Sequence, residues 1–247
     1  MQFHKGTFLK RYKRFFADVI TSGNEPLTIH CPNTGAMTGL LQEGVEALFT
    51  LATPQEMKTR KTPGTLEALR VFVEDDQKHY WVGVNTHRAN QIAQNWLESE
   101  AACREFAITS VRSEVKLQQL YNTLVKKVPE LAQGDVLMKT RVDFFVEREN
   151  QKPLLIEVKS ATLYQDKQGF FPDAVSKRAT QQLQDMLFMQ DLGFDVMILY
   201  VSQHQAIEDV KPAEHIDKEY AALVSHAKGK GVIVKTLTFD AGFYGVE

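Results

Sequence analysis

Cysteine is scarce in this sequence, and long apolar runs are missing. The 247 residues include only Cys31 and Cys103, too few for a disulfide framework or a four-cysteine zinc site. This low cysteine usage favours a reducing compartment. The longest clean apolar run, Val196 to Val201, is far shorter than the roughly 20 residues of a membrane span. Because the basic amino terminus also lacks the apolar stretch of a signal peptide, we expect a soluble cytoplasmic protein with no membrane partner.

A large excess of charge of one sign is also missing. Lys and Arg total 29 and Asp and Glu total 31, which gives a net charge of -2. The chain as a whole therefore has no attraction to polyanions, and it is not a basic chromatin-type protein. The hydrophobic share of 43% excludes disorder. No Walker loop or dinucleotide fingerprint appears, so we expect no organic cofactor.

The first third of the chain has the pattern of short strands separated by turns. We expect five strands, over Phe8 to Ile20, Leu27 to Cys31, Val45 to Thr53, Thr65 to Glu74 and Tyr80 to Asn85. Five strands in so short a segment favour a small barrel of the oligonucleotide-binding (OB) type. Helical spacing begins near Arg88. We therefore predict an OB-like barrel over residues 1–87 and a second domain over residues 88–247.

The second part alternates between strands and helices. The expected helices are Arg88 to Glu105, Lys116 to Leu131, Ser176 to Leu192 and Glu214 to Lys228, and the expected strands are Arg141 to Glu147, Leu154 to Leu163, Val196 to Val201 and Val232 to Phe239. The third of these strands is apolar on both faces, as a central buried strand requires. The pattern predicts an α/β domain with a mixed sheet.

Two of these strands carry charges where the core of a sheet does not tolerate them. Asp143 lies on the first strand, and Glu157 and Lys159 lie on the second. Charged side chains are rarely buried unless they are paired or bound to metal. A hairpin symmetric about Asn150 places Asp143 opposite Glu157, with side-chain roots about 5 Å apart. Lys159 then follows on the face of Glu157, with Arg141 opposite it.

Two carboxylates at this separation repel each other unless a proton or a cation lies between them. Mg²⁺ or Mn²⁺ suits such a pair, because water and phosphate fill the remaining coordination positions. With Lys159 beside the metal, the group favours hydrolysis of phosphodiesters: the metal lowers the pKa of a bound water, and the lysine positions that water or stabilises the transition state. The alternative is a structural set of salt bridges, which an acid-any-Lys triplet can form by chance.

The order Asp, Glu-x-Lys and helix resembles the restriction-endonuclease-like PD-(D/E)XK core. Longer strings resemble the sugar fermentation stimulation protein A family, namely Arg11 to Ile20, His30 to Gly39, Val84 to Thr86, Glu157 to Ser160 and Phe171 to Val175. This resemblance covers nearly the whole chain. It implies an OB barrel followed by a nuclease-like domain, DNA binding without sequence specificity, and a suggested role in regulating sugar metabolism. It leaves open whether DNA is cleaved.

By position, the resemblance makes Asp143, Glu157 and Lys159 the nuclease-type catalytic residues, with the two acids as metal ligands. It adds Glu114, which matches an acid that precedes the Asp motif. The family has a short link from that acid to Arg-x-Asp, whereas here Leu117 to Lys139 intervene and Thr140 stands where Ser is usual. Glu114 is therefore either a further member of the site or a surface glutamate.

Basic residues gather at the amino terminus, where residues 1–20 carry a local charge of +4 and include Tyr12, Phe15 and Phe16. Cations interleaved with aromatic rings suit the binding of a nucleic-acid backbone. The alternative is that the rings are barrel core and the cations its solvated face. The predicted DNA contacts are Arg11, Lys13, Arg14, Arg60, Lys61 and Arg141.

Three functions stay open at this point. The first is DNA binding through backbone charge, in the barrel and in the cleft between the domains. The second is a Mg²⁺- or Mn²⁺-dependent nuclease. The third is a partner-binding protein with an inactive nuclease fold, which predicts salt bridges from Arg141 to Glu157 or from Asp143 to Lys159.

Overall fold

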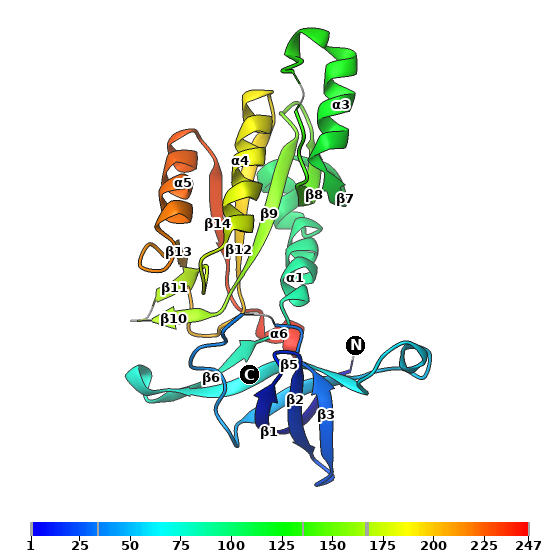
Figure 1. Cartoon of the computed structure of the whole chain (residues 1–247), viewed down its shortest axis with the longest axis vertical. Coiled ribbons are helices and arrows are strands. Elements are labelled where there is room, and N and C mark those ends of the chain that lie inside the picture. The colour runs from blue at the N-terminus through cyan, green and yellow to red at the C-terminus, as the bar shows by residue number, and fades with distance from the viewer. Residues whose placement is uncertain (1, 34, 135, 166–167, 247) are drawn as a thin grey trace.

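The chain forms a barrel and an α/β domain that are stacked end to end (Figure 1). The computed structural model describes residues 2–33, 35–134, 136–165 and 168–246. Within these residues, the amino-terminal domain has six strands: β1 (His4–Tyr12), β2 (Phe16–Thr21), β3 (Pro26–His30), β4 (Glu46–Leu51), β5 (Gly64–Val73) and β6 (Lys78–Gly83). Their order is β3-β2-β1-β4-β5-β6, and a pairing of β3 with β5 closes the first five into a ring. The ring confirms the predicted five-stranded barrel.

The five strands of the ring differ from those expected. The expected strand from Phe8 to Ile20 is a hairpin of β1 and β2, because Lys13 and Arg14 adopt φ of 48° and 62° and reverse the chain. Neither residue type favours a positive φ, so no turn is visible in the sequence there. The expected last strand corresponds to β6, which joins β5 from outside the ring.

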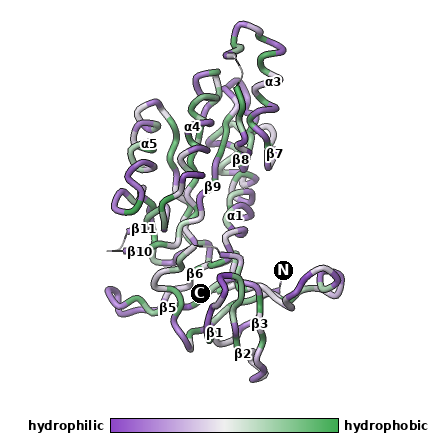
Figure 2. The backbone as a smooth tube through the Cα atoms, in the orientation of Figure 1, coloured by the Kyte–Doolittle hydropathy of each residue, from purple (hydrophilic) through white to green (hydrophobic). Residues whose placement is uncertain are grey.

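The barrel core is filled from alternate positions of its strands. Phe8, Val19, Ile29, Phe49 and Leu66 are all at most 2% exposed. Successive side chains of a strand point to opposite faces, so apolar and polar residues alternate along these strands (Figure 2). Burial of this apolar set holds the ring closed.

The second domain is built on a mixed sheet, as predicted. In the described residues its strands are β7 (Ile108–Lys116), β8 (Arg141–Arg148), β9 (Leu154–Ala161), β12 (Asp195–Ser202) and β14 (Ile233–Leu237). Their order is β14-β12-β9-β8-β7. The first three in the chain pair antiparallel, whereas β9, β12 and β14 run parallel. A small sheet lies beside it, formed by β10 (Leu163–Gln165), β11 (Gln168–Phe171) and β13 (Val210–Pro212).

Helices cover both faces of the mixed sheet. One face packs against α1 (His87–Leu97) and α2 (Glu100–Phe106), and the other against α3 (Leu117–Lys127), α4 (Lys177–Asp191) and α5 (Lys218–Gly229). β12 contributes alternate residues to both cores, which confirms the predicted central strand. The shorter helices are α6 (Ala241–Tyr244), η1 (Glu56–Lys58), η2 (Glu74–Asp76) and η3 (Pro129–Leu131). None of the helices described here has both the length and the apolar character needed to cross a membrane.

Several elements of this domain differ from the sequence-based expectation, and the small sheet of β10, β11 and β13 is one of them. The single helix expected from Arg88 to Glu105 is divided into α1 and α2, because the Ser99 hydroxyl accepts the amide N–H of Ala102 at 3.3 Å and caps a new helix. β7 was not expected at all. It is an edge strand whose side chains are mostly exposed, so it lacks the apolar run that marks the buried strands.

A buried ion pair joins the two domains. Glu67 of β5 is fully buried, and Arg88 of α1 donates from Nη2 to Oε1 at 2.6 Å and from Nε to Oε2 at 2.8 Å. Thr50 and Asn85 donate to the same carboxylate at 2.8 and 2.9 Å. These charge-assisted bonds compensate the cost of burying the carboxylate. They fix the first turn of α1 to the barrel wall.

β6 forms a second connection between the domains. The amide of Gly83 donates to the carbonyl of Gln203 at 2.6 Å, and the amide of Gln205 donates to the carbonyl of Trp81 at 2.9 Å. The Trp81 amide in turn donates to Oε1 of Gln205 at 3.0 Å. The sixth strand therefore docks the α/β domain instead of closing the barrel.

The buried pair gives a stability prediction. Replacement Arg88→Met leaves the Glu67 charge buried without its partner, and we expect the free energy of unfolding to fall by about 3–5 kcal/mol. The matched control is Arg104→Met, which breaks an exposed pair with Glu100 and should cost less than about 1 kcal/mol. Urea denaturation measures both. Equal losses for the two variants would contradict the role of the buried pair.

Candidate active site

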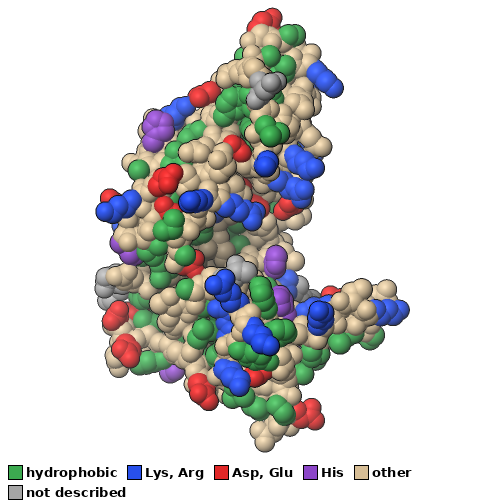
Figure 3. Space-filling view, viewed as in Figure 1, with side chains coloured by type: hydrophobic (Ala, Val, Ile, Leu, Met, Phe, Trp, Pro, Cys, Tyr) green, Lys and Arg blue, Asp and Glu red, His purple; other side chains and the backbone are tan. Residues whose placement is uncertain are grey.

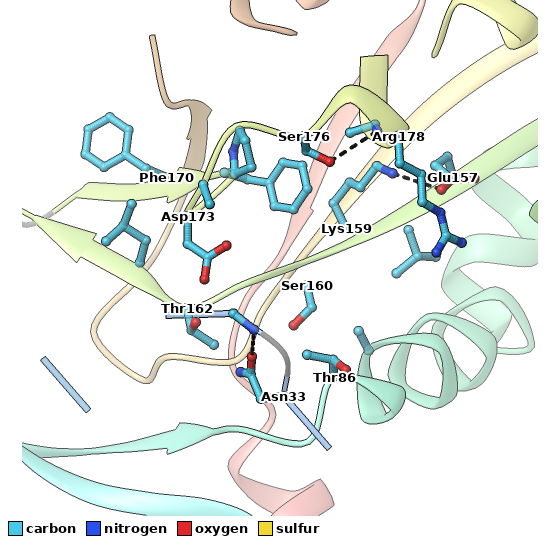
Figure 4. Close-up of a pocket in the computed structure, with 18 of the residues that line it drawn as sticks. Asn33, Thr86, Glu157, Lys159, Ser160, Thr162, Phe170, Asp173, Ser176 and Arg178 are labelled. Atoms are coloured by element: carbon cyan, nitrogen blue, oxygen red, sulfur yellow. Dashed lines mark hydrogen bonds and ion pairs between the residues drawn. The ribbon is translucent and has the colours of Figure 1, made fainter. Parts of the chain in front are cut away.

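A cavity of about 470 Å³ lies between the barrel and the α/β domain. Asn33, Gly35 and Thr86 line it from the barrel side, and β9, the segment after β11 and the start of α4 line it from the other side (Figure 4). The surface is hollowed at this level, and Lys and Arg side chains lie above and below the hollow (Figure 3). We call this space the cleft cavity.

The hairpin of β8 and β9 has the predicted register. The described pairs are Phe144–Ile156, Phe145–Leu155 and Val146–Leu154. Asn150 at the tip has a φ of 54°, as a turn residue of this type tolerates. The next position of the same register holds Asp143 and Glu157. Here Asp143 Oδ2 accepts the amide N–H of Val158 at 2.7 Å, so a side chain supplies the acceptor where the described ladder ends.

The Glu157 carboxylate is buried beside Lys159. Their exposed fractions are 5% and 8%. Lys159 Nζ donates to Oε1 of Glu157 and to Oε1 of Gln182, both at 2.9 Å. Oε2 of Glu157 is buried and has no hydrogen-bond partner in the described part of the chain. Burial raises the pKa of Glu157 to about 7, although the Lys159 charge opposes this and the Asp143 charge adds to it.

Asp143 is held from two sides. Asn90 of α1 donates from Nδ2 to Oδ1 at 2.8 Å, and the Val158 amide binds the other oxygen. Burial raises the pKa of Asp143, while these two hydrogen bonds and the Lys159 charge lower it. Because α1 is fixed to the barrel by Arg88, the barrel also determines where Asn90 holds this carboxylate.

Glu114 and Arg141 lie in an adjoining cavity of about 500 Å³, which shares Asp143 with the cleft cavity. The β7–β8 ladder places Glu114 across from Asp143. Arg141 Nη1 donates to Oε2 of Glu114 at 3.2 Å, and both side chains are exposed. The strand registers therefore place Glu114, Asp143 and Glu157 in one row across β7, β8 and β9.

The inserted segment from Leu117 to Lys139 does not displace Glu114. It contains α3 and η3, and α3 lies at the end of the domain farthest from the barrel (Figure 1). β7 and β8 stay paired up to Lys116 and Arg141, so the insertion leaves from the end of the ladder. The role of Glu114 stays a prediction, and its position beside Asp143 is compatible with that role.

The ion pairs differ from those expected. Lys159 pairs with Glu157 at 2.9 Å and Arg141 with Glu114 at 3.2 Å. Among the described ion pairs there is neither Arg141–Glu157 nor Asp143–Lys159, the two bridges predicted for an inactive fold. Arg141 pairs with Glu114 on β7, which is the other neighbour of β8 in the sheet.

Arg11 supports the wall of the cleft cavity, and its predicted contact with DNA stays a prediction. Its guanidinium donates from Nη2 to the carbonyl of Asn33 at 2.6 Å and from Nη1 to that of Gly35 at 3.1 Å. A Cβ at Gly35 would come within 2.3 Å of Oδ2 of Asp173, so only glycine allows this carboxylate to approach the barrel. Arg11 thus positions the loop that forms one side of the cavity.

The other predicted cations of the barrel lie at two separate places. Lys13 and Arg14 are exposed in the turn between β1 and β2. Arg60 and Lys61 line a further cavity on the barrel. Contact of these residues with DNA stays a prediction.

A hydrogen-bond chain behind the cleft cavity was not foreseen. Tyr244 donates from its hydroxyl to Oε1 of Gln203 at 2.6 Å, and Gln203 donates from Nε2 to Oγ of Ser160 at 2.7 Å. Because the Ser160 oxygen accepts this bond, its own proton is available to a ligand in the cavity, which Ser160 lines. Ser160 belongs to the Glu-x-Lys-Ser string, but the other two residues are distant in sequence and only the fold brings them together.

The carboxylates of Asp143 and Glu157 fit a hard divalent cation whose remaining ligands are water and phosphate. Within the described residues no group of three or more His, Cys, Asp or Glu is arranged to hold a metal ion. Asp143 and Glu157 alone would supply protein ligands, with Oε2 of Glu157 unpartnered. Mg²⁺ is commonly held by one or two carboxylates, with water and phosphate completing its octahedron.

Two family models match the chain in succession. One, described as the SfsA N-terminal OB domain, matches residues 9–84, and the other, described as the sugar fermentation stimulation protein RE domain, matches residues 87–242. The chain belongs to the sugar fermentation stimulation protein family. This confirms the resemblance found in the sequence.

Relatives in the sugar fermentation stimulation protein family match over most of their length. A sugar fermentation stimulation protein homolog of Shewanella frigidimarina is 35% identical over 233 residues, which are 94% of this chain and 88% of the relative. That of Shewanella woodyi is 36% identical over 230 residues, 93% and 87% of the two chains. The solved structure of Pyrococcus furiosus SfsA in complex with Ca²⁺ has a TM-score of 0.66 at 18% identity and covers 96% of this chain and 88% of its own. At that identity the likeness shows the fold.

The buried Glu157 gives a prediction about pH. Its pKa in the folded protein is raised to about 7, so the folded state holds the proton more tightly than the unfolded chain. This contribution to stability is complete below the ordinary pKa of a glutamate and is lost as pH rises through about 7. In EDTA we expect the wild type to lose about 2–3 kcal/mol between pH 5 and pH 8 relative to Glu157→Gln. Urea denaturation across pH measures the difference, and parallel curves for the two proteins would contradict it.

Proposed function

We propose that this protein is a divalent-metal-dependent nuclease that binds DNA without sequence preference in the cleft between its domains. The observation that supports this most directly is the buried Glu157 carboxylate, one oxygen of which has no described partner, beside Asp143 and Lys159. A buried charge requires compensation. Glu157 lies in the wall of an open cavity, so a cation that enters with a phosphate can compensate its charge.

Asp143 and Glu157 would hold Mg²⁺ or Mn²⁺. The bound metal would lower the pKa of a water and neutralise charge on the phosphate. The Pyrococcus furiosus relative was solved in complex with Ca²⁺, an ion that, like Mg²⁺, takes oxygen ligands. This supports a cation site in the family without fixing the identity of the metal here.

Side chains around the two acids are suited to a phosphodiester. Lys159 is held by Glu157 and Gln182, so its ammonium is oriented to stabilise the charge that develops on phosphate oxygens. Arg178 is exposed and lines both the cleft cavity and the adjoining one. A guanidinium there can bind a second phosphate of the strand through two hydrogen bonds.

The expected lack of sequence preference follows from the kind of contact. Lys13, Arg14 and Arg141 are exposed and are suited to bind backbone phosphates, and phosphate contacts carry no direct base information. With a net charge of -2, attraction comes from local patches. Affinity should therefore fall as salt rises.

A second candidate is DNA binding without cleavage, with the regulatory role in sugar metabolism that the family resemblance suggests. It is favoured by the Lys159–Glu157 ion pair, which partly compensates the buried carboxylate without a metal. In that case the site stabilises the sheet and the cleft serves only for binding.

Cleavage assays distinguish the two candidates. Labelled single-stranded DNA, duplex DNA and RNA are incubated with Mg²⁺, Mn²⁺ or EDTA. We expect metal-dependent cleavage of DNA by the wild type and a loss of at least about 100-fold for Asp143→Asn and for Lys159→Ala. Glu147→Gln, an exposed acid on β8 outside the cavity, is the matched control and should retain full activity. DNA binding without cleavage under every condition would leave only the second candidate.

Metal binding gives an independent prediction. Titration calorimetry with Mn²⁺ should detect binding by the wild type and none by Asp143→Ala. Ligands must be deprotonated to bind metal, so affinity should fall as pH drops below about 7, the pKa of Glu157. Equal binding by wild type and Asp143→Ala would remove Asp143 as a ligand.

A further inference from the structure

A third cavity, of about 470 Å³, opens on the barrel beside α1. Its charged and titratable lining consists of His30, Arg60, Lys61 and His87, and no described Asp or Glu lines it. We call it the cationic pocket. Figure 3 shows His, Lys and Arg side chains gathered where the surface is notched between the domains. A cavity with four basic groups and no described acid is suited to an anion.

Arg60 is held ready to bind an anion. Its Nη2 donates to Oγ1 of Thr65 at 2.5 Å and to the carbonyl of Gly64 at 3.3 Å. Its remaining N–H groups have no hydrogen-bond partner among the described residues. A guanidinium that is already oriented loses less freedom when it binds phosphate. Lys61, the next residue, is exposed and adds a mobile charge.

The two histidines come from different elements. His30 ends β3, and its Nδ1 lies 3.1 Å from the carbonyl of Phe15, so a proton there leaves Nε2 to take up the second one. His87 is the first residue of α1 and is exposed. Burial lowers the pKa of His30, the charges of Arg60 and His87 lower it further, and the Phe15 carbonyl opposes them. The groups that face His30 are thus basic or neutral, and a bound anion would favour its protonated form.

An exposed aromatic ring lies next to the pocket. Phe15 is 46% exposed, and its ring is stacked with that of His30 at 6.5 Å between centroids and 11° between planes. An exposed ring beside a phosphate-binding groove stacks on an unpaired base. In a duplex the bases are already stacked on each other, so only a single strand can use this ring.

The cationic pocket shares a wall with the cleft cavity. Thr86 donates from its hydroxyl to the carbonyl of Pro32 at 3.3 Å. Asn33 and Thr86 line the cleft cavity, whereas their chain neighbours Pro32 and His87 line the cationic pocket. A nucleic-acid strand bound in the cleft cavity can therefore continue over this wall into the cationic pocket.

We propose that the cationic pocket is a phosphate subsite for single-stranded nucleic acid. His30, Arg60, Lys61 and His87 bind one backbone phosphate of a strand whose nearby phosphodiester lies at Asp143, and Phe15 stacks on a base. This inference rests on the proposed function and deepens it by naming the form of the substrate.

Fluorescence anisotropy with a labelled 12-nucleotide single strand tests the subsite in EDTA, where no cleavage interferes. Lys61→Ala should weaken binding by about 3- to 10-fold and reduce the slope of log affinity against log salt by about 1. The matched control is Lys58→Ala, an exposed lysine of the same loop outside the pocket, which should bind like the wild type. Phe15→Ala should weaken binding of the single strand and leave a duplex of the same length unaffected.

The pH dependence tests His30. Single-strand affinity of the wild type should rise by about 3- to 10-fold from pH 7.5 to pH 5.5, as protonated His30 binds phosphate. Glu157 takes up a proton in the same range. The readout is therefore the difference between the wild type and the variant His30→Gln, which should lose most of the rise.

The outcomes separate the subsite from the nuclease. Wild-type affinity in Lys61→Ala and an unchanged pH response in His30→Gln would overturn the subsite, even if DNA is cleaved. Equal weakening of single strand and duplex by Phe15→Ala would overturn the single-strand assignment. Loss of affinity in these variants without any cleavage by the wild type would support the subsite and contradict the nuclease. A wild type that binds no nucleic acid would overturn both.

Discussion

The carboxylate of Glu157 is largely buried in the wall of the cleft cavity. One of its oxygens binds Lys159 and the other has no described partner, while Ile156 and Val158 on either side belong to the apolar core. A charge buried in this way is costly. It is stabilised either by a proton, since its pKa is raised to about 7, or by a cation placed between it and Asp143. The choice between a proton and a cation at Glu157 connects the stability of the sheet to the chemistry of the cleft.

The two domains build the site together. Arg88 fixes α1 to the barrel, and Asn90, two residues later on α1, orients Asp143. On the other side, Gln203 accepts an amide proton from β6 through its carbonyl and donates to Ser160 through its side chain. The same short segments thus make the domain contacts and position the groups of the cavity. The geometry of the site therefore depends on the docking of the barrel.

The sequence was most informative where charge and strand pattern conflict. A turn centred on Asn150 was sufficient to predict the β8–β9 register, and this register placed Asp143 opposite Glu157. The barrel was predicted in type, but its hairpin at Lys13 and Arg14 was not, since these residues adopt positive φ without glycine. The position of Glu114 could not be predicted, because β7 is an exposed edge strand and α3 separates it from β8 in the chain. The link from Tyr244 through Gln203 to Ser160 depends entirely on tertiary packing.

We propose that Asp143 and Glu157 share a cation in the cleft. The most direct measurement is the anomalous diffraction of crystals grown with Mn²⁺ at a pH above 7. We expect one strong anomalous peak at about 2 Å from a carboxylate oxygen of Asp143 and from Oε2 of Glu157. No peak between these carboxylates, with Lys159 still paired to Glu157 at 2.9 Å, would contradict the shared cation.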